Sequence, residues 1–188
     1  MRLGAGSFFA FAVVAVATTT ALPRAASADP QLGAALTTGA GFTDMRASNG
    51  PRVAYHLGGR FDALFLRDRA GTMALGPYVG LATEAFDTFQ TGGGLEWLLP
   101  IGDPVLVFSG GGFARTSRFG WEPGAEATVF FGSRSFNYHS FYSLGLGAFL
   151  QGRYGFGDGK QADAILGVQV DLEYLALPAL FIYEAIAH

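Results

Sequence analysis

The sequence has 188 residues; half of them are hydrophobic and only 14% are charged. The formal net charge is −3 at pH 7 and Lys160 is the only lysine, so the chain lacks the basic surface typical of nucleic-acid binding. Cysteine is absent, which excludes disulfide bonds and a lipid-modified cysteine.

Residues 1–28 have the pattern of a cleaved export signal. Met1 and Arg2 form a short positive start, residues 8–20 are uncharged and mostly apolar, and Ala26-Ser27-Ala28 is a small-residue cleavage site. The apolar run is shorter than the roughly 20 residues that a membrane-spanning helix needs, although an uncleaved anchor is the alternative. We expect a mature chain of residues 29–188 with a charge of −5, because cleavage removes Arg2 and Arg24.

Alternation with a period of two predicts four strands in the first half of the mature chain. The clearest is segment 53–65, where apolar residues from Val53 to Phe65 alternate with His56, Arg60 and Asp62 on the other face. Segments 31–42, 75–86 and 89–99 follow the same pattern, with Glu84 and Glu96 on the polar faces of the last two. Each segment is therefore expected to have one polar and one apolar face.

Four further strands are expected in the second half, over segments 105–115, 122–132, 142–154 and 166–174. Their polar faces carry Glu126, Arg153, Asp171 and Glu173. Segment 105–115 is apolar on both faces at its start, so alternation does not assign its inward face. Glycine runs at 92–94 and 110–112 lie inside strand patterns and precede no predicted helix, which favours strand curvature over nucleotide binding.

These segments must close into a barrel if they enter a membrane, because in hydrocarbon an unpaired backbone N–H or C=O costs several kcal/mol. An eight-stranded barrel has an interior just wide enough for side chains to fill it. The sequence predicts a packed polar interior without an open pore. Its expected polar network consists of His56, Arg60, Asp62, Glu84, Glu96, Glu126, Arg153, Asp171 and Glu173. Acids outnumber arginines in this set, so some carboxylates are expected to be hydrated, protonated or bound to a ligand.

The signal, the eight alternating segments, the short connectors and the aromatic segment ends resemble the small eight-stranded outer-membrane β-barrel proteins of diderm (Gram-negative) bacteria. The resemblance covers residues 31–174. It implies an all-β, antiparallel up-and-down transmembrane β-barrel at residues 29–174, located in the cell outer membrane. Its expected partners are outer-membrane lipids and the barrel insertion machinery, with no nucleic acid, and the expected state is a monomer.

The C-terminal end departs from the family pattern. Segment 167–174 is similar to the aromatic-ended strand that the insertion machinery reads, but residues 175–188 follow it. Pro178 and the apolar residues after it indicate a short C-terminal helix. The alternative is that the last strand continues through this tail.

Aromatic residues near the segment ends are expected to form two interfacial belts. They are Phe42, Tyr55, Phe65, Phe89, Trp97, Trp121, Tyr142, Tyr154 and Tyr174. With a periplasmic N-terminus, the turns near Asn49, Asp87, Arg118 and Asp158 face outward and those near Arg69, Asp103 and Phe136 face inward. None of the outward turns is long, which argues against an adhesin or receptor role.

The sequence favours a structural, envelope or surface-contact role without catalysis. Some barrels of this class modify lipid A through a His, a Ser and a carboxylate, and the candidates here are His139 with Ser140 or Ser143. Phe141 occupies the position where the deacylase pattern has Ser, and no Asp or Glu lies nearby. We therefore predict no catalytic residue, no cofactor-binding residue and no metal site. A lipid A-modifying enzyme is the minor alternative.

A soluble periplasmic barrel that binds an apolar ligand, as lipocalin-like proteins do, is the other alternative. It would turn the apolar faces inward around a cavity and the charged faces outward. A soluble surface usually contains about 25–35% charged residues. The 14% in this chain favours lipid on the outside of the barrel.

Overall fold

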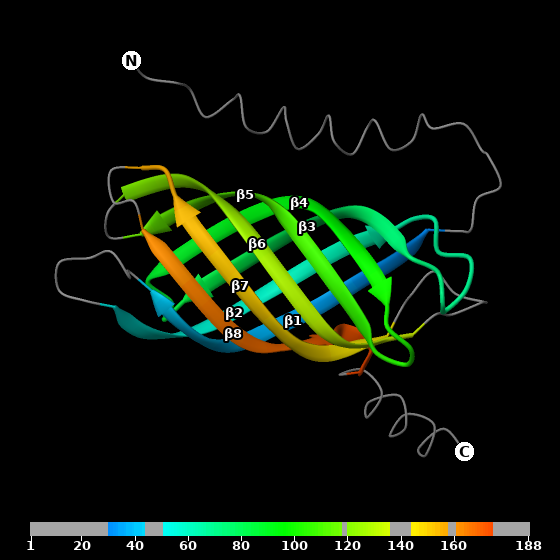
Figure 1. Ribbon diagram of the computed structural model, residues 1–188. Coiled ribbons are helices and arrows are strands. Elements are labelled where there is room, and N and C mark those ends of the chain that lie inside the picture. The colour runs from blue at the N-terminus through cyan, green and yellow to red at the C-terminus, as the bar shows by residue number, and fades with distance from the viewer. Residues whose placement is uncertain (1–29, 44–50, 118–119, 136–143, 158–160, 175–188) are drawn as a thin grey trace, which may run out of the picture.

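The computed structural model describes residues 30–43, 51–117, 120–135, 144–157 and 161–174. Its strands are β1 (Gln31–Thr43), β2 (Arg52–Leu64), β3 (Ala74–Glu84), β4 (Thr88–Pro100), β5 (Val105–Ser117), β6 (Gly120–Arg134), β7 (Gly145–Gly155) and β8 (Ala162–Asp171). Each strand pairs antiparallel with the next, and β8 pairs with β1 to close the barrel (Figure 1). The predicted eight-stranded up-and-down β-barrel is thereby confirmed.

The strands define two rims, because consecutive strands run in opposite directions. We call the rim where β1 begins and β8 ends the proximal rim; it carries the turns 65–73 and 101–104. The distal rim carries the turn 85–87 and the ends of β7 and β8 that flank residues 156–157 and 161. On the sequence-based topology, the proximal rim is the one expected to face the periplasm.

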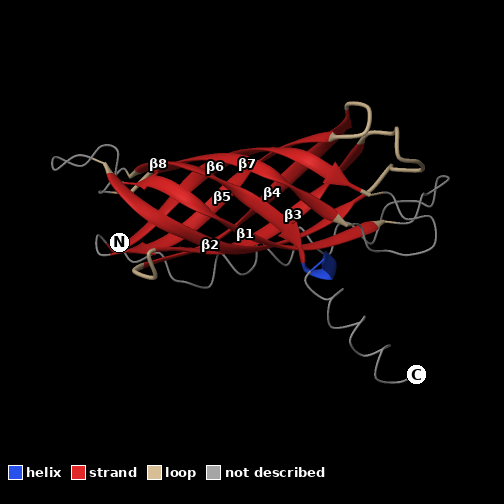
Figure 2. Cartoon of the chain, turned by 90° about the horizontal axis from the view of Figure 1, so that it is seen from below, coloured by secondary structure: helices blue, strands red, loops and turns tan. Residues whose placement is uncertain are grey.

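The last strand begins and ends earlier in the chain than predicted. β8 ends at Asp171, and Leu172, Glu173 and Tyr174 form a helical turn at its end (Figure 2). The expectation of a strand to Tyr174 was wrong, because Asp171 is the last residue of β8 that pairs with β1 and its pairing with β7 ends one residue earlier. The export signal 1–28 and the tail 175–188 lie outside the described residues.

β3 and β7 also stop short of their predicted bounds at one end. β3 ends at Glu84, because Ala85 and Phe86 have positive φ angles of 49° and 60° and turn the chain directly into β4. β7 begins at Gly145 rather than at residue 142, and residues 136–143 lie outside the described part of the chain. The enzyme candidates His139, Ser140 and Ser143 fall in that range.

Side chains alternate between the barrel interior and its outer wall, as the period of two requires. The inward face of β5, which alternation left open, carries Val107, Ser109, Phe113 and Arg115. Buried apolar side chains from several strands form one cluster: Leu64, Ala74, Leu98, Val105, Val107, Phe130, Phe149 and Ile165. Four of these, Leu64, Ala74, Leu98 and Val105, lie at or near strand ends on the proximal rim.

The two glycine runs lie opposite each other in β4 and β5, where Gly93 pairs with Gly112 and Gly94 with Gly111. A Cβ atom on Gly111 would lie 2.7 Å from Gly94 Cα, closer than real Cβ contacts come. A Cβ atom on Gly94 would likewise clash with the backbone oxygen of Gly110, so Gly94 and Gly111 require glycine because the neighbouring backbone occupies the space of a side chain.

Candidate functional site

The barrel interior is the candidate site, because it gathers most of the charged side chains of the strands. The structure places His56, Asp62, Glu84, Glu96, Glu126, Arg153 and Asp171 inside and buried, and Arg60 inside with 12% of its side chain exposed. Glu173 lies in the helical turn after β8 and is half-buried. Eight of the nine residues of the expected network therefore point into one enclosed space.

A first set of ion pairs lies toward the proximal rim. Arg134 of β6 crosses the interior to Asp62 of β2, and its Nη1 lies 3.5 Å from Glu96 Oε1 of β4. The second oxygen of Glu96 accepts a hydrogen bond of 2.6 Å from Arg60 Nη2. We call Asp62, Glu96, Arg134 and Arg60 the proximal cluster. It ties β2, β4 and β6 together across the interior.

Tyr78 connects this cluster to the middle of the barrel. The guanidinium of Arg60 lies 3.9 Å from the centre of the Tyr78 ring, a cation–π contact. Tyr78 OH donates a hydrogen bond of 2.9 Å to Glu126 Oε1. The other oxygen of Glu126 accepts from Gln90 Nε2 at 2.8 Å and Gln151 Nε2 at 3.2 Å. Three neutral donors therefore hold the Glu126 carboxylate in the middle of the interior.

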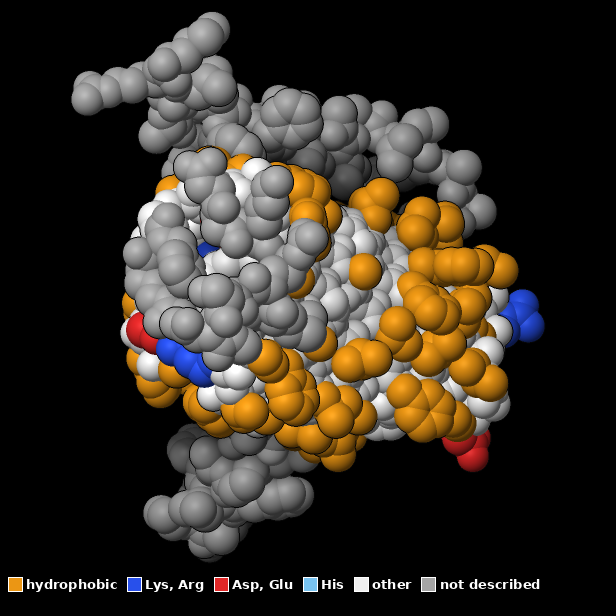
Figure 3. All heavy atoms as spheres, turned by 60° about the vertical axis from the view of Figure 1, so that its left-hand side comes forward, with side chains coloured by type: hydrophobic (Ala, Val, Ile, Leu, Met, Phe, Trp, Pro, Cys, Tyr) orange, Lys and Arg blue, Asp and Glu red, His pale blue; other side chains and the backbone are white. Residues whose placement is uncertain are grey.

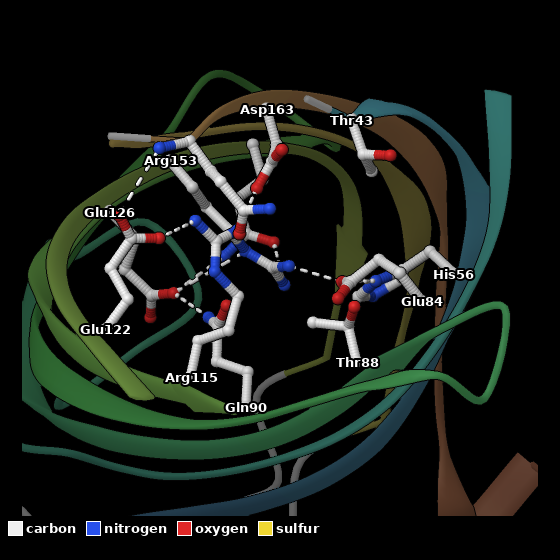
Figure 4. Close-up of polar contacts among 12 residues, drawn as sticks. Thr43, His56, Glu84, Thr88, Gln90, Arg115, Glu122, Glu126, Arg153 and Asp163 are labelled. Carbon is white, nitrogen blue, oxygen red and sulfur yellow. Dashed lines mark hydrogen bonds and ion pairs between the residues drawn. The ribbon is translucent and has the colours of Figure 1, made fainter. Parts of the chain in front are cut away.

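Toward the distal rim, Arg153 forms an ion pair with Glu84, which also accepts from the imidazole of His56 at 3.1 Å (Figure 4). His56 Nε2 lies 3.2 Å from Thr37 Oγ1. Thr37, His56 and Glu84 therefore form a hydroxyl, imidazole and carboxylate series, the order found in acyl-transfer triads. The series is enclosed, since His56 and Glu84 are each 2% exposed.

Arg115, Glu122 and Asp163 form a separate set at the distal rim (Figure 4). Arg115 of β5 contacts Asp163 of β8 and, at 2.6 Å, Glu122 of β6. The backbone N–H of Gln161 donates to Glu122 at 3.3 Å. Three strands are thus joined through one buried guanidinium.

Sequence reasoning missed Arg115, Glu122, Arg134 and Asp163, and the predicted segment bounds, which were too short, explain the last two. Arg134 lies two residues beyond the expected segment 122–132, and Asp163 lies three residues before the expected segment 166–174. Continuing the alternation beyond the predicted segment ends would have placed Arg134 and Asp163 on faces that point into the barrel. Arg134 supplies a basic partner for Asp62 of the expected set, whereas Arg115 pairs with Glu122 and Asp163, two acids that the set had also lacked.

Arg67 closes the proximal end of the interior. It lies in the turn after β2, is 2% exposed, and donates to Gln31 Oε1 at 3.1 Å and to the backbone oxygen of Arg134 at 3.0 Å. Leu66 has a φ of 68°, so Leu66 points outward and Arg67 inward where strict alternation would do the opposite. Burial and the neighbouring Arg134 lower the pKa of Arg67 to about 10, so it remains charged at neutral pH.

A cavity of about 50 Å³ lies in the middle of the interior, lined by residues that include Thr37, His56, Tyr78, Glu126 and Arg153. A second cavity, of about 10 Å³, lies beside the proximal cluster. An apolar cavity that binds benzene has a volume of about 150 Å³. The central cavity is therefore too small for an acyl substrate to reach the Thr37, His56 and Glu84 series.

The described residues contain no group of three or more His, Cys, Asp or Glu side chains placed to hold a metal ion. Within the same residues, no helix has the length and hydrophobicity needed to cross a bilayer. No protein-family model, curated protein or solved structure matches this chain.

Proposed function

We propose that this chain is an outer-membrane β-barrel protein with a structural or surface-contact role in the cell envelope, and that its filled interior is closed to solutes. The observation that carries the proposal is the distribution of charge across the wall. In the eight described strands, every charged residue occupies an inward-facing position, and the most exposed of them, Arg52, lies at the distal rim. A surface that faces lipid has this distribution.

The outer wall supports the proposal. Large apolar side chains are exposed along it, among them Val79, Leu95, Phe131 and Leu166. Figure 3 shows apolar side chains over much of the barrel wall, with charged side chains toward its two ends. Of the predicted aromatic belts, Phe42, Tyr55, Phe89, Trp97, Trp121 and Tyr154 are exposed near the rims.

The strand lengths also suit a bilayer. β1, β2, β4 and β5 each have 13 residues. At about 3.4 Å per residue and a tilt of about 40°, such a strand rises roughly 34 Å along the barrel axis. The hydrocarbon core of a bilayer is about 30 Å thick. The strands are therefore long enough to cross it.

The two alternatives fit the geometry less well. A soluble ligand-binding barrel needs an apolar interior around a cavity of ligand size, whereas this interior is charged and its central cavity is about 50 Å³. A lipid A-modifying enzyme needs its nucleophile where lipid can reach it. Among the described residues, the Thr37 and His56 pair faces the interior, where lipid cannot reach a nucleophile, and the His139, Ser140 and Ser143 candidates lie outside the described residues. A closed barrel with a structural role needs neither feature.

The two tryptophans of the sequence provide the test. Trp97 and Trp121 are 44% and 55% exposed on the outer wall, near the proximal and distal rims respectively. In vesicles, we expect lipids brominated near the carbonyl groups to quench both fluorescence signals more strongly than lipids brominated deep in the chain.

Trp97→Phe and Trp121→Phe variants assign the quenching to one rim at a time. A membrane-spanning barrel places one tryptophan at each interface, so each single-tryptophan variant should show the same shallow quenching. If brominated lipid does not quench the tryptophan fluorescence of either variant, the membrane proposal is contradicted.

A further inference from the structure

The central cavity contains polar atoms that the surrounding side chains leave without partners. Gln90 Oε1, Thr128 Oγ1 and Arg153 Nε are buried and have no hydrogen-bond partner among the described residues. All three residues line the cavity of about 50 Å³. An unpartnered polar group in a buried site costs about 1–3 kcal/mol, so three of them around one space point to a ligand that bonds to them.

Neighbouring contacts fix the orientations of these atoms. Gln90 Nε2 donates to Glu126 Oε2 at 2.8 Å, so the amide oxygen of Gln90 has to point away from that carboxylate. Arg153 uses Nη1 for Glu84 and Nη2 for Gln151 Oε1, while its Nε lies 3.8 Å from Glu126, beyond hydrogen-bond range. The cavity therefore presents an acceptor, a hydroxyl and a donor in known positions.

Charge and size determine what can occupy the space. Arg60 on the cavity wall is paired with Glu96, and Arg153 with Glu84. The Glu126 carboxylate on the same wall accepts from three neutral donors and lies 3.8 Å from Arg153 Nε, so each charge on the wall already has partners and no ion is needed to balance it. One buried water needs about 10–15 Å³ and two to four polar partners. The cavity of about 50 Å³ thus has room for roughly three to five waters.

We propose that the central cavity is an internal water-binding site that holds a cluster of about three to five ordered waters. These waters accept from Arg153 Nε, donate to Gln90 Oε1 and bond to Thr128 Oγ1. They complete the network around Glu126 and fill the space between the proximal cluster and the Glu84 pair. The proposal concerns the interior only and holds whether or not the outer wall faces lipid.

A crystal structure of the detergent-solubilised barrel tests the proposal directly. We expect ordered density at hydrogen-bond distance from Gln90 Oε1 and Thr128 Oγ1, and no xenon in the cavity when crystals are pressurised with the gas. An empty cavity, a cavity that takes up xenon, or density for a bound ion or buffer molecule would each overturn it.

A substitution gives an independent test in solution, because a hydrated cavity and a dry cavity predict opposite changes in the urea midpoint of unfolding. Thr128→Val keeps the side-chain shape and removes the hydroxyl. If water bonds to Thr128, the change removes one of its partners and lowers the urea midpoint of unfolding. If the cavity is dry, the change removes an unpartnered buried hydroxyl and raises the midpoint.

Thr91→Val is the matched control, because Thr91 is an exposed residue of β4 on the outer wall. It changes strand propensity and hydrophobicity in the same way without touching the cavity. We expect the Thr128→Val midpoint to fall below that of the wild type while the Thr91→Val midpoint does not. The proposal would be overturned if the Thr128→Val midpoint rises by as much as, or more than, the Thr91→Val midpoint does.

Discussion

At the scale of single residues, the interior depends on arginines that each contact more than one strand. Arg134 of β6 contacts acids of β2 and β4, and Arg115 of β5 contacts acids of β8 and β6. A guanidinium has five N–H donors in a planar fork, which suits it to bridge two carboxylates. The contacts of Arg134 with β2 and β4, and of Arg115 with β8, therefore link strands that the backbone ladder does not pair, whereas Glu122 is the ladder partner of Arg115.

Removing one such arginine is predicted to be costly. Arg115→Met leaves Glu122 and Asp163 buried without their guanidinium partner, since Arg115 is 2% exposed. Breaking a buried ion pair from one side costs about 3–5 kcal/mol. We expect a loss of that size in the free energy of unfolding, measured by urea titration in detergent micelles.

The control restores charge balance around the same site. The triple variant Arg115→Met, Glu122→Gln and Asp163→Asn removes all three charges and keeps the side-chain volumes similar. It should recover most of the lost stability, because neutral amides no longer need a cation. If the triple variant is as unstable as Arg115→Met alone, shape rather than charge decides stability at this site.

At the scale of elements, the ladder between β2 and β3 contains a gap that the sequence explains. The paired register ends at Asp62 and Tyr78 and resumes only at Phe65 and Leu75, which exchange backbone hydrogen bonds of 2.9 and 3.2 Å. In an antiparallel ladder every second pair exchanges bonds, so Ala63 and Pro77 are the next such pair. Pro77 has no N–H, and the ladder is interrupted there.

Pro77→Thr is predicted to close this seam. Threonine supplies the missing N–H donor and places a residue of high strand propensity on the outer wall. A ladder hydrogen bond contributes about 1 kcal/mol to stability. We expect slower hydrogen exchange of the amides around Ala63 and Leu75 and a higher urea midpoint than in the control. Pro104→Thr, the same change in the turn between β4 and β5, controls for the entropy of the unfolded chain. Equal exchange rates in both variants would show that the seam has another cause.

Most of the fold follows from the period of two, because burial of one face imposes alternation on every strand. The inward positions of His56, Glu84, Glu126 and Arg153 were predictable for this reason. Strand ends were not, since they depend on where a neighbour stops pairing, as at Asp171. The partners of each charge were also beyond sequence reasoning, because residues that meet across the lumen, such as Arg134 and Asp62, are far apart in the chain.

At the scale of the whole molecule, side chains fill the barrel from rim to rim. Arg67 and the proximal cluster lie toward one end, Glu126 in the middle, and Arg115 with its acids at the other. We therefore predict no stepwise ion currents when the folded protein is added to a planar lipid bilayer. Boiled protein controls for detergent leak, and steady unitary steps seen only with the folded protein would require an open path that this interior lacks.

The most direct test of a membrane-spanning closed barrel is the gel mobility of the protein recovered from an outer-membrane fraction, with and without boiling. Membrane barrels that are closed by strand pairing resist detergent, so the folded form keeps its shape on the gel until it is heated. The account predicts recovery in the outer membrane and a clear mobility difference between the two samples. Recovery in the soluble periplasmic fraction with identical mobilities would contradict it.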